Sequence, residues 1–213
     1  MKKLLATLCL LSFALGSASA QNLLSDPGFE SNTPGAGGGI GGWEFFNGAE
    51  FSTEVVRTGS YSGKFYTKDN VPGAFEALPA APGEVYTLTG WGYMPVDLEP
   101  GTVFGGIQIS YFDDIGTDLG TVEAGPGTAS ADFQMFPGQP VGEWIPMSIT
   151  ATAPAGTTKI QPFGIFIEFD STAVDPQGFY LDDMSLVLVP EPSTFALLGG
   201  LLALGFVLYR KRK

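Results

Sequence analysis

The chain is 213 residues long, has a formal charge of −12 at neutral pH, and contains no histidine and a single cysteine. The lack of histidine excludes Ser-His-Asp catalysis and the usual Cys/His zinc sites, and a lone cysteine cannot form an intrachain disulfide bond. Because an acidic chain repels the phosphate backbone of nucleic acids, we expect no nucleic-acid partner.

The N-terminal segment has the layout of a secretion signal. Lys2 and Lys3 precede an apolar run from Leu4 to Gly16, which is followed by the small residues Ala-Ser-Ala. This order predicts a signal peptide over residues 1–20, cleaved before Gln21. The alternative is a buried N-terminal helix, which the absence of any amphipathic pattern disfavours. We therefore expect the protein to be exported.

Residues 21–189 contain four basic and 21 acidic residues, a formal charge of −17, and are long enough for one domain with its own core. Gly and Pro divide this segment into short runs rich in β-forming residues, without an amphipathic helical stretch. These runs predict an all-β domain, folded as a two-sheet jelly roll or β-sandwich. The predicted strands span residues 43–46, 64–67, 74–78, 85–93, 103–112, 144–152, 159–169 and 179–189.

Several predicted strands alternate with period two, as expected when one face of a sheet is buried. In the strand 144–152 the apolar set is Ile145, Met147 and Ile149. In the strand 159–169 it is Phe163, Ile165, Ile167 and Phe169. We expect both sets to face the core, which places Trp144 and Glu168 on the outer face.

The C-terminal segment carries a second apolar run, from Phe195 to Tyr209, followed directly by the basic residues 210–213. The run predicts a single hydrophobic helix of about 22 Å, short for a hydrocarbon core of about 30 Å. Such a helix spans only where the bilayer thins or flanking residues help. Lysine and arginine resist translocation, so we expect the basic tail to stay on the cytoplasmic side and the domain to face outward.

The motif Pro190-Glu191-Pro192, the short apolar helix and the basic tail together resemble the C-terminal signal of PEP-CTERM proteins. This resemblance implies that an exosortase-like membrane protease recognises the motif and processes the tail during surface sorting. A permanent tail anchor is the alternative. The expected organisation is a signal peptide at 1–20, a jelly-roll domain at 21–189 and a sorting signal at 190–213. The protein would be membrane-anchored transiently or permanently, and then reach the cell surface or extracellular matrix.

Five segments of the domain follow one another in a recognisable order: Asn22–Glu30, Gly42-Trp43, Thr58–Lys64, Tyr86–Trp91 and Phe179–Leu186. Together they resemble the corresponding segments of carbohydrate-binding modules with a galactose-binding-like jelly roll. Asp26 stands where the family usually has asparagine. The resemblance implies the fold and places Trp43 in the core. It does not by itself imply sugar binding, because unrelated functions share this scaffold.

The same resemblance implies a structural calcium ion held by Glu30 and Asp182. Backbone carbonyl groups around Gly28 and the turn at residues 57–63 would complete the coordination. Calcium binds six to eight oxygen atoms, and a buried carboxylate is costly without a cation or a hydrogen-bond donor. The alternative is that these carboxylates only accept backbone hydrogen bonds or pair with Lys64.

Sugar binding requires aromatic side chains with polar neighbours, because a sugar ring has apolar faces and polar edges. Trp91 and Tyr93 share a predicted strand face with two threonines and are candidate binding residues, as is Trp144. Other residues expected on an outer face, and so on the same concave surface, are Gln108, Phe112 and Glu168. The alternative for each aromatic residue is packing in the core.

These observations predict an exported, non-catalytic surface or matrix module associated with polysaccharide and sorted by an exosortase-type system. The first alternative is a structural or adhesion protein that binds protein partners or copies of itself. The second is a glycan-active enzyme with paired carboxylates. We expect no enzyme, because no segment of this acidic domain singles out a carboxylate pair.

Overall fold

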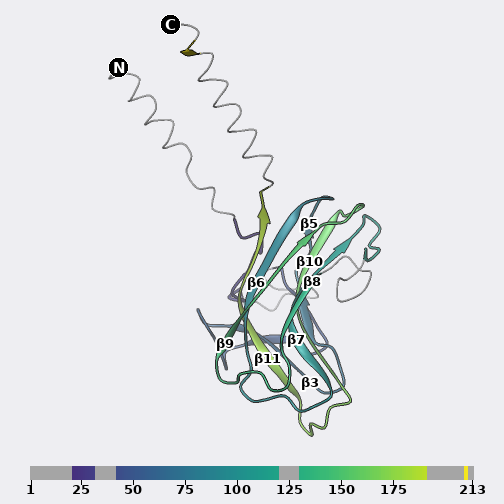
Figure 1. Cartoon of the computed structure of the whole chain (residues 1–213). Coiled ribbons are helices and arrows are strands. Elements are labelled where there is room, and N and C mark those ends of the chain that lie inside the picture. Colours follow the sequence, from purple (N-terminus) through teal and green to yellow (C-terminus); the bar gives the residue numbers. More distant parts are fainter. Residues whose placement is uncertain (1–20, 32–41, 120–129, 191–208, 211–213) are drawn as a thin grey trace, which may run out of the picture.

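The computed structural model describes residues 21–31, 42–119, 130–190 and 209–210. The predicted signal peptide, most of the predicted hydrophobic helix and most of the basic tail lie outside these residues. The described chain forms two antiparallel sheets packed face to face (Figure 1). This confirms the predicted all-β sandwich. In the part of the chain that the structure describes, no helix has the length and apolar character that crossing a membrane requires.

The six-stranded sheet has the order β1-β4-β10-β7-β8, with β5 paired to β10, and the five-stranded sheet has the order β2-β3-β11-β6-β9. The chain passes repeatedly from one sheet to the other, so most neighbouring strands within a sheet are distant in sequence. The described strands are β1 (Glu44–Phe46), β2 (Glu50–Ser52), β3 (Ser62–Thr67), β4 (Gly73–Phe75), β5 (Leu78–Pro79), β6 (Val85–Tyr93), β7 (Thr102–Phe112), β8 (Ser130–Met135), β9 (Trp144–Thr152), β10 (Lys159–Phe169) and β11 (Gln177–Val189).

Seven of the eight predicted strands agree with observed strands to within two residues at each end. The exception is the prediction for residues 74–78, which is wrong because the segment divides into β4 and β5. Between these strands Glu76 is buried, and its carboxylate accepts the N–H of Ser25 at 3.1 Å. The prediction also missed β2, which is too short to show a period, and β8, which lacks β-branched residues.

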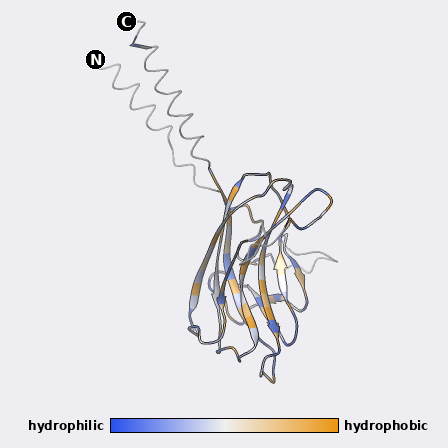
Figure 2. Ribbon diagram, turned by 45° about the vertical axis from the view of Figure 1, so that its right-hand side comes forward, coloured by the Kyte–Doolittle hydropathy of each residue, from blue (hydrophilic) through white to orange (hydrophobic). Residues whose placement is uncertain are grey.

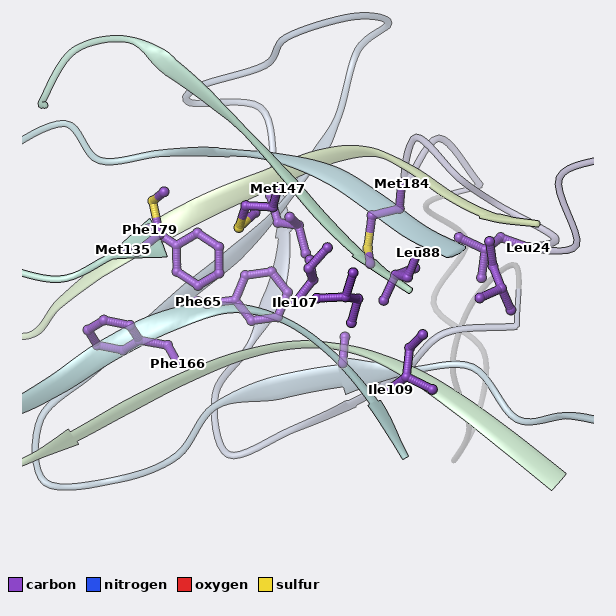
Figure 3. Close-up of a cluster of buried hydrophobic side chains, with 14 of the residues drawn as sticks. Leu24, Phe65, Leu88, Ile107, Ile109, Met135, Met147, Phe166, Phe179 and Met184 are labelled. Carbon is purple, nitrogen blue, oxygen red and sulfur yellow. The ribbon is translucent and has the colours of Figure 1, made fainter. Parts of the chain in front are cut away.

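The core lies between the two sheets (Figure 3). Hydrophobic residues lie along the strands, interspersed with hydrophilic ones, as expected when each strand buries one face (Figure 2). Trp43 is fully buried, stacks on Phe29 with ring centroids 5.0 Å apart, and donates its indole N–H to the carbonyl of Asp26 at 2.7 Å. The core position expected for Trp43 is therefore confirmed.

The two ends of the domain are joined. The side chain of Asn22 donates to the carbonyl of Met184 and accepts the N–H of Leu186, both at 3.0 Å, and Leu23 donates its N–H to the carbonyl of Leu186 at 2.8 Å. The first residues of the domain therefore lie beside the C-terminal half of β11. The sequence after β11 leaves from this same end of the sandwich.

Candidate functional site

Five aromatic side chains lie on the outer face of the five-stranded sheet. Alternation along β6 buries Leu88 and leaves Trp91 and Tyr93 half-buried on the outside. The strand register places Tyr93 opposite Trp144 of β9 and opposite Tyr180 of β11. The structure therefore brings all three aromatic residues predicted for sugar binding to one surface. This aromatic face consists of Tyr66, Trp91, Tyr93, Trp144 and Tyr180.

The rings of the aromatic face pack in two pairs. The ring centroids of Tyr93 and Trp144 are 5.3 Å apart, and those of Tyr66 and Tyr180 are 5.4 Å apart. Tyr180 is almost fully buried, whereas the other three rings are half-buried and reach solvent. Pairs of aromatic rings at such distances hold each other in place, which makes a pre-formed apolar platform.

Trp91 is covered by a cation. The guanidinium carbon of Arg57 lies 3.9 Å from the centroid of the Trp91 ring, a cation–π contact. Arg57 is held there by Asp183, whose carboxylate it contacts at 2.5 Å and whose second oxygen accepts the hydroxyl of Thr58. One face of Trp91 is thus occupied by the protein itself, and Tyr93 and Trp144 are the predicted binding residues that no described cation covers.

A second ion pair lies at the other end of the aromatic face. The ammonium group of Lys64 is 2.9 Å from the carboxylate of Glu54 and 3.9 Å from that of Glu50. The hydroxyl of Tyr180 also donates to Glu54. These hydrogen bonds, first that of Tyr180 and then that of Lys64, lower the pKa of Glu54, so the carboxylate stays charged.

The two carboxylates predicted to bind calcium hold the same loop, between β2 and β3. The carboxylate of Asp182 is fully buried and accepts the N–H groups of Arg57 at 2.9 Å and Thr58 at 3.2 Å. Glu30 accepts the N–H groups of Ser60 at 2.9 Å and Tyr61 at 3.1 Å. Burial raises the pKa of Asp182 to about 6, although these N–H groups oppose the shift.

The described partners of Glu30 and Asp182 are therefore N–H groups, and Lys64 pairs with Glu54 instead of with either residue. Within the described ranges, no three His, Cys, Asp or Glu side chains gather in a way that could hold a metal ion. Because calcium needs six to eight oxygen atoms, the two carboxylates and their N–H donors do not by themselves fit a calcium ion. Calcium at this position stays a prediction from the family resemblance.

Three further residues expected beside the aromatic face lie elsewhere. Gln108 and Phe112 are on the outer face of the six-stranded sheet, on the other side of the sandwich. Glu168 is 0% exposed, and its carboxylate accepts the N–H of Asp69 and the hydroxyl of Ser171. The expectation that Glu168 lies on an outer face is therefore wrong, and so is the expected single concave surface.

The inner and outer faces of β10 are the reverse of those predicted. Phe166 is fully buried, whereas Phe163 and Ile165 point outward and are only half-buried. The reason is Gly164, where an added Cβ would lie 2.4 Å from the side chain of Leu181. The glycine lets the two sheets approach closely, and both faces of β10 are apolar enough that alternation alone does not tell which is inside.

The outward residues of β10 belong to a second surface that the sequence interpretation missed. The rings of Phe75 and Phe163 have centroids 5.1 Å apart, and those of Phe104 and Phe133 are 5.0 Å apart. All of these residues are half-buried. This phenylalanine face consists of Phe46, Phe75, Phe104, Phe133 and Phe163, with Ile165 and Ile167.

Sequence reasoning also missed the charged residues around the aromatic face. Arg57 and Lys64 come from β3 and the loop before it, and Asp183 comes from β11, more than a hundred residues later. The one signal available was the rarity of cations in the domain, since two of its four basic residues lie here. Tyr66 and Tyr180 had a clearer signal, because both occupy alternating positions in predicted strands.

Residues 188–213 match the family model of the PEP-CTERM protein-sorting motif. The chain carries a PEP-CTERM sorting motif. The resemblance inferred from its terminal sequence is thereby confirmed. No curated protein matches the chain in sequence.

Solved structures are similar to the domain in fold. A tandem CBM22-1–CBM22-2 domain of Xyn10C from Paenibacillus barcinonensis matches with a TM-score of 0.50 and 17% identity, over 83% of this chain and 49% of that one. The enzymatically active domain of tailspike protein 4 from bacteriophage CBA120 matches with a TM-score of 0.50 and 14% identity, over 79% of this chain and only 21% of that one. A CBM61 module solved with β-1,4-galactotriose has a TM-score of 0.48 and 15% identity, over 80% and 100%. The resemblance to carbohydrate-binding modules is thus confirmed for the fold.

Proposed function

We propose that this PEP-CTERM protein is an exported, non-catalytic module that binds polysaccharide and is sorted to the cell surface or matrix by an exosortase-type protease. The observation that carries the binding proposal is the aromatic face, where Tyr93 and Trp144 form a half-buried pair with ring centroids 5.3 Å apart. The sorting proposal rests on the motif at residues 188–213.

The aromatic face has the chemistry that a sugar ring requires. The rings of Tyr93 and Trp144 offer apolar surface for the C–H groups of a pyranose. Polar side chains continue along the same face, where the hydroxyls of Thr87 and Thr150 are 2.8 Å apart. Such hydroxyls can donate to and accept from sugar hydroxyl groups.

The binding pair and the sorting motif lie at opposite ends of the domain. Tyr93 pairs with Tyr180 near the start of β11, and Val85 pairs with Val189 at its end. At about 3.3 Å per residue over the eight residue steps of β6 from Tyr93 to Val85, the two ends of this pairing are about 26 Å apart. A protein held through its C-terminal segment would thus present the binding pair away from the membrane.

The start of the sorting motif is accessible. Leu188 is 39% exposed, Val189 is 37% exposed, and Pro190 is also exposed. We propose Pro190, Glu191 and Pro192 as the residues that the sorting protease recognises. Proline favours an extended backbone, which a protease active site accepts more readily than a helix.

Affinity electrophoresis tests the binding proposal. The full chain, in a non-ionic detergent, is run through gels that contain a panel of neutral and acidic polysaccharides. We expect retardation by at least one of them, and a roughly 2- to 10-fold weaker affinity for Trp144→Ala, the loss of about 0.5–1.5 kcal/mol for one aromatic contact. Phe112→Ala, on the other sheet, is the matched control. Wild-type mobility in every gel would contradict the proposal.

The second candidate function is a structural or adhesion role through the phenylalanine face. Its centre carries the uncharged side chains Gln108 and Ser110, hydrogen-bonded at 2.9 Å, within a domain of formal charge −17. A second copy of the chain could cover the centre of this face without meeting a charge there; the carboxylate of Glu44 lies at its edge, on β1 opposite Phe75. Light scattering of the full chain tests this, with Phe163→Ser expected to abolish a dimer. A monomer at all concentrations would contradict the second candidate.

The calcium ion predicted at Glu30 and Asp182 is tested separately by thermal unfolding. A ligand that binds only the native state raises its stability, so calcium at this position requires a higher Tm in excess calcium than in chelator. Equal Tm values would contradict calcium binding at Glu30 and Asp182.

A further inference from the structure

We infer that the aromatic face selects uncharged polysaccharides over anionic ones. The inference rests on the proposed function and adds the chemical class of the ligand. An anionic polysaccharide carries carboxylate or sulfate groups, which proteins bind with arginine and lysine side chains. Binding of an anionic polysaccharide therefore requires a cation on the aromatic face that is not already paired with a carboxylate of the protein.

The two described cations at this face are both paired. Arg57 contacts the carboxylate of Asp183 at 2.5 Å while its guanidinium lies on the Trp91 ring. Lys64 contacts Glu54 at 2.9 Å, and Glu50 lies 3.9 Å from the same ammonium group. The face therefore bears more carboxylates than cations.

The remaining basic residues of the domain are engaged elsewhere. Lys68 donates to the carbonyl of Ala173, beyond the strand β3. Lys159 lies 5.7 Å from the centroid of the Phe112 ring, on the six-stranded sheet. A uronate bound at Tyr93 and Trp144 would thus meet no available cation from residues 21–189, and the formal charge of −17 would repel it.

Breaking either ion pair so that the cation can bind an anionic ligand gives the wild-type chain no net electrostatic gain. If Arg57 turned toward a uronate, it would leave Asp183 without its charged partner and would give up its contact with Trp91. The exchange replaces one ion pair by another and adds a second carboxylate nearby, which is unfavourable. A neutral sugar requires no such exchange.

The first arm of the test compares polysaccharides that differ only in charge. Affinity electrophoresis of the full chain uses polygalacturonate and alginate, each beside its carboxyl-reduced form, together with neutral galactan, xylan and β-glucan. We expect retardation by at least one neutral polymer and at least tenfold weaker binding to each anionic polymer than to its reduced form, most clearly at low salt. Equal binding to an anionic polymer and its reduced form would overturn the inference while leaving the proposed function intact. No retardation by any polymer would overturn both.

The second arm removes the carboxylates that neutralise the cations. The double variant Glu54→Gln and Asp183→Asn keeps one acceptor oxygen at each position. It leaves Arg57 without its paired carboxylate and Lys64 with only Glu50, 3.9 Å away. Asparagine tolerates the positive φ of 48° at position 183. We expect it to gain binding to the anionic polymers at low salt, at least tenfold, with less than twofold change for the neutral ones.

The matched control for the second arm is Glu44→Gln with Asp114→Asn. This variant makes the same change in net charge, at exposed positions on the six-stranded sheet and in the loop after β7. We expect it to behave as wild type. An equal gain in the control would overturn the inference, because overall charge and not the paired cations of the aromatic face would then set the selectivity.

Discussion

The carboxylate of Asp182 accepts three backbone N–H groups, two of which belong to residues more than a hundred positions away in the sequence. Arg57 and Thr58 donate to one of its oxygens, and the N–H of Asp183 donates to the other at 2.7 Å. Three N–H donors stabilise the charged form, yet burial dominates and raises the pKa to about 6. The native state therefore holds this proton more tightly than the unfolded chain does.

This shift predicts a pH dependence of stability. A carboxyl group with a raised native pKa binds more protons folded than unfolded, so its contribution is fully present below the unfolded value near 4 and is lost as pH rises to about 6. We expect the unfolding free energy of wild type, relative to Asp182→Asn, to fall between pH 4 and 6. Urea unfolding across this range measures it. A constant or rising difference would contradict the prediction.

Gly59 shows how closely the loop at residues 57–61 approaches Glu30. Its φ is +73°, and an added Cβ would lie 2.1 Å from a carboxylate oxygen of Glu30. Gly83 has a similar φ of +85° with no atom within 4 Å. A substitution at Gly83 thus costs only the left-handed backbone, whereas one at Gly59 also displaces the carboxylate.

We therefore expect Gly83→Ala to lower the unfolding free energy by about 1–2 kcal/mol and Gly59→Ala to lower it by more. The difference between the two variants isolates the contact with Glu30. Chemical denaturation of both variants checks this, and equal losses would refute the role assigned to Glu30.

At the scale of elements, β11 connects the parts of the molecule. It lies between β3 and β6 in the five-stranded sheet. Its pairing with β6 has a register shift between Asp182 and Ser185, next to the Asp182 carboxylate that holds the loop between β2 and β3. Beside this register shift, the side chain of Asn22 donates to the carbonyl of Met184 and accepts the N–H of Leu186. The N-terminal residues are thereby fastened to the strand that leads to the sorting motif.

Replacing Asn22 should loosen this end of the domain. We expect Asn22→Ala to lower the unfolding free energy by about 1–3 kcal/mol, and so to lower Tm, because it removes hydrogen bonds to two part-buried backbone groups. Limited proteolysis should also cleave the variant faster before Leu24. Unchanged stability and an unchanged cleavage rate would show that this contact does not hold the end in place.

At the scale of the whole molecule, the aromatic face and the start of the sorting motif lie toward opposite ends of the domain. The C-terminal end of β11, which leads to the sorting motif, lies at one pole of the sandwich, and the Tyr93–Trp144 pair lies about 26 Å away, at the other end of the pairing between β6 and β11. A binding surface far from the attachment point can reach a polymer outside the cell envelope. The proposed sorting and binding roles are therefore compatible in one small chain.

The sorting proposal predicts the mass of the mature protein from its native host. We expect residues 1–20 to be missing and the chain to be cut near Pro190-Glu191-Pro192. Intact-mass spectrometry of the surface fraction measures both processing events at once. A full-length, unprocessed chain recovered from the cytosol would refute export and sorting together.

The PEP-CTERM sorting motif and most strand positions could be predicted without the structure, and the signal peptide stays a prediction. Signal peptides and sorting tails are read as short linear patterns, so Pro190, Glu191 and Pro192 need no fold to be recognised. Strand positions follow from local alternation and from the glycines and prolines between the runs. The aromatic residues Trp91, Tyr93 and Trp144 were predicted from the same local pattern.

The buried face of β10 and the surroundings of the candidate site could not be predicted without the three-dimensional structure. Both faces of β10 are apolar, and the choice depends on how closely Leu181 packs against Gly164 from the other sheet. The covering of Trp91 by Arg57 depends on Asp183, 126 residues away. Such contacts form between strands that are neighbours in space but not in sequence, and no local periodicity carries that information.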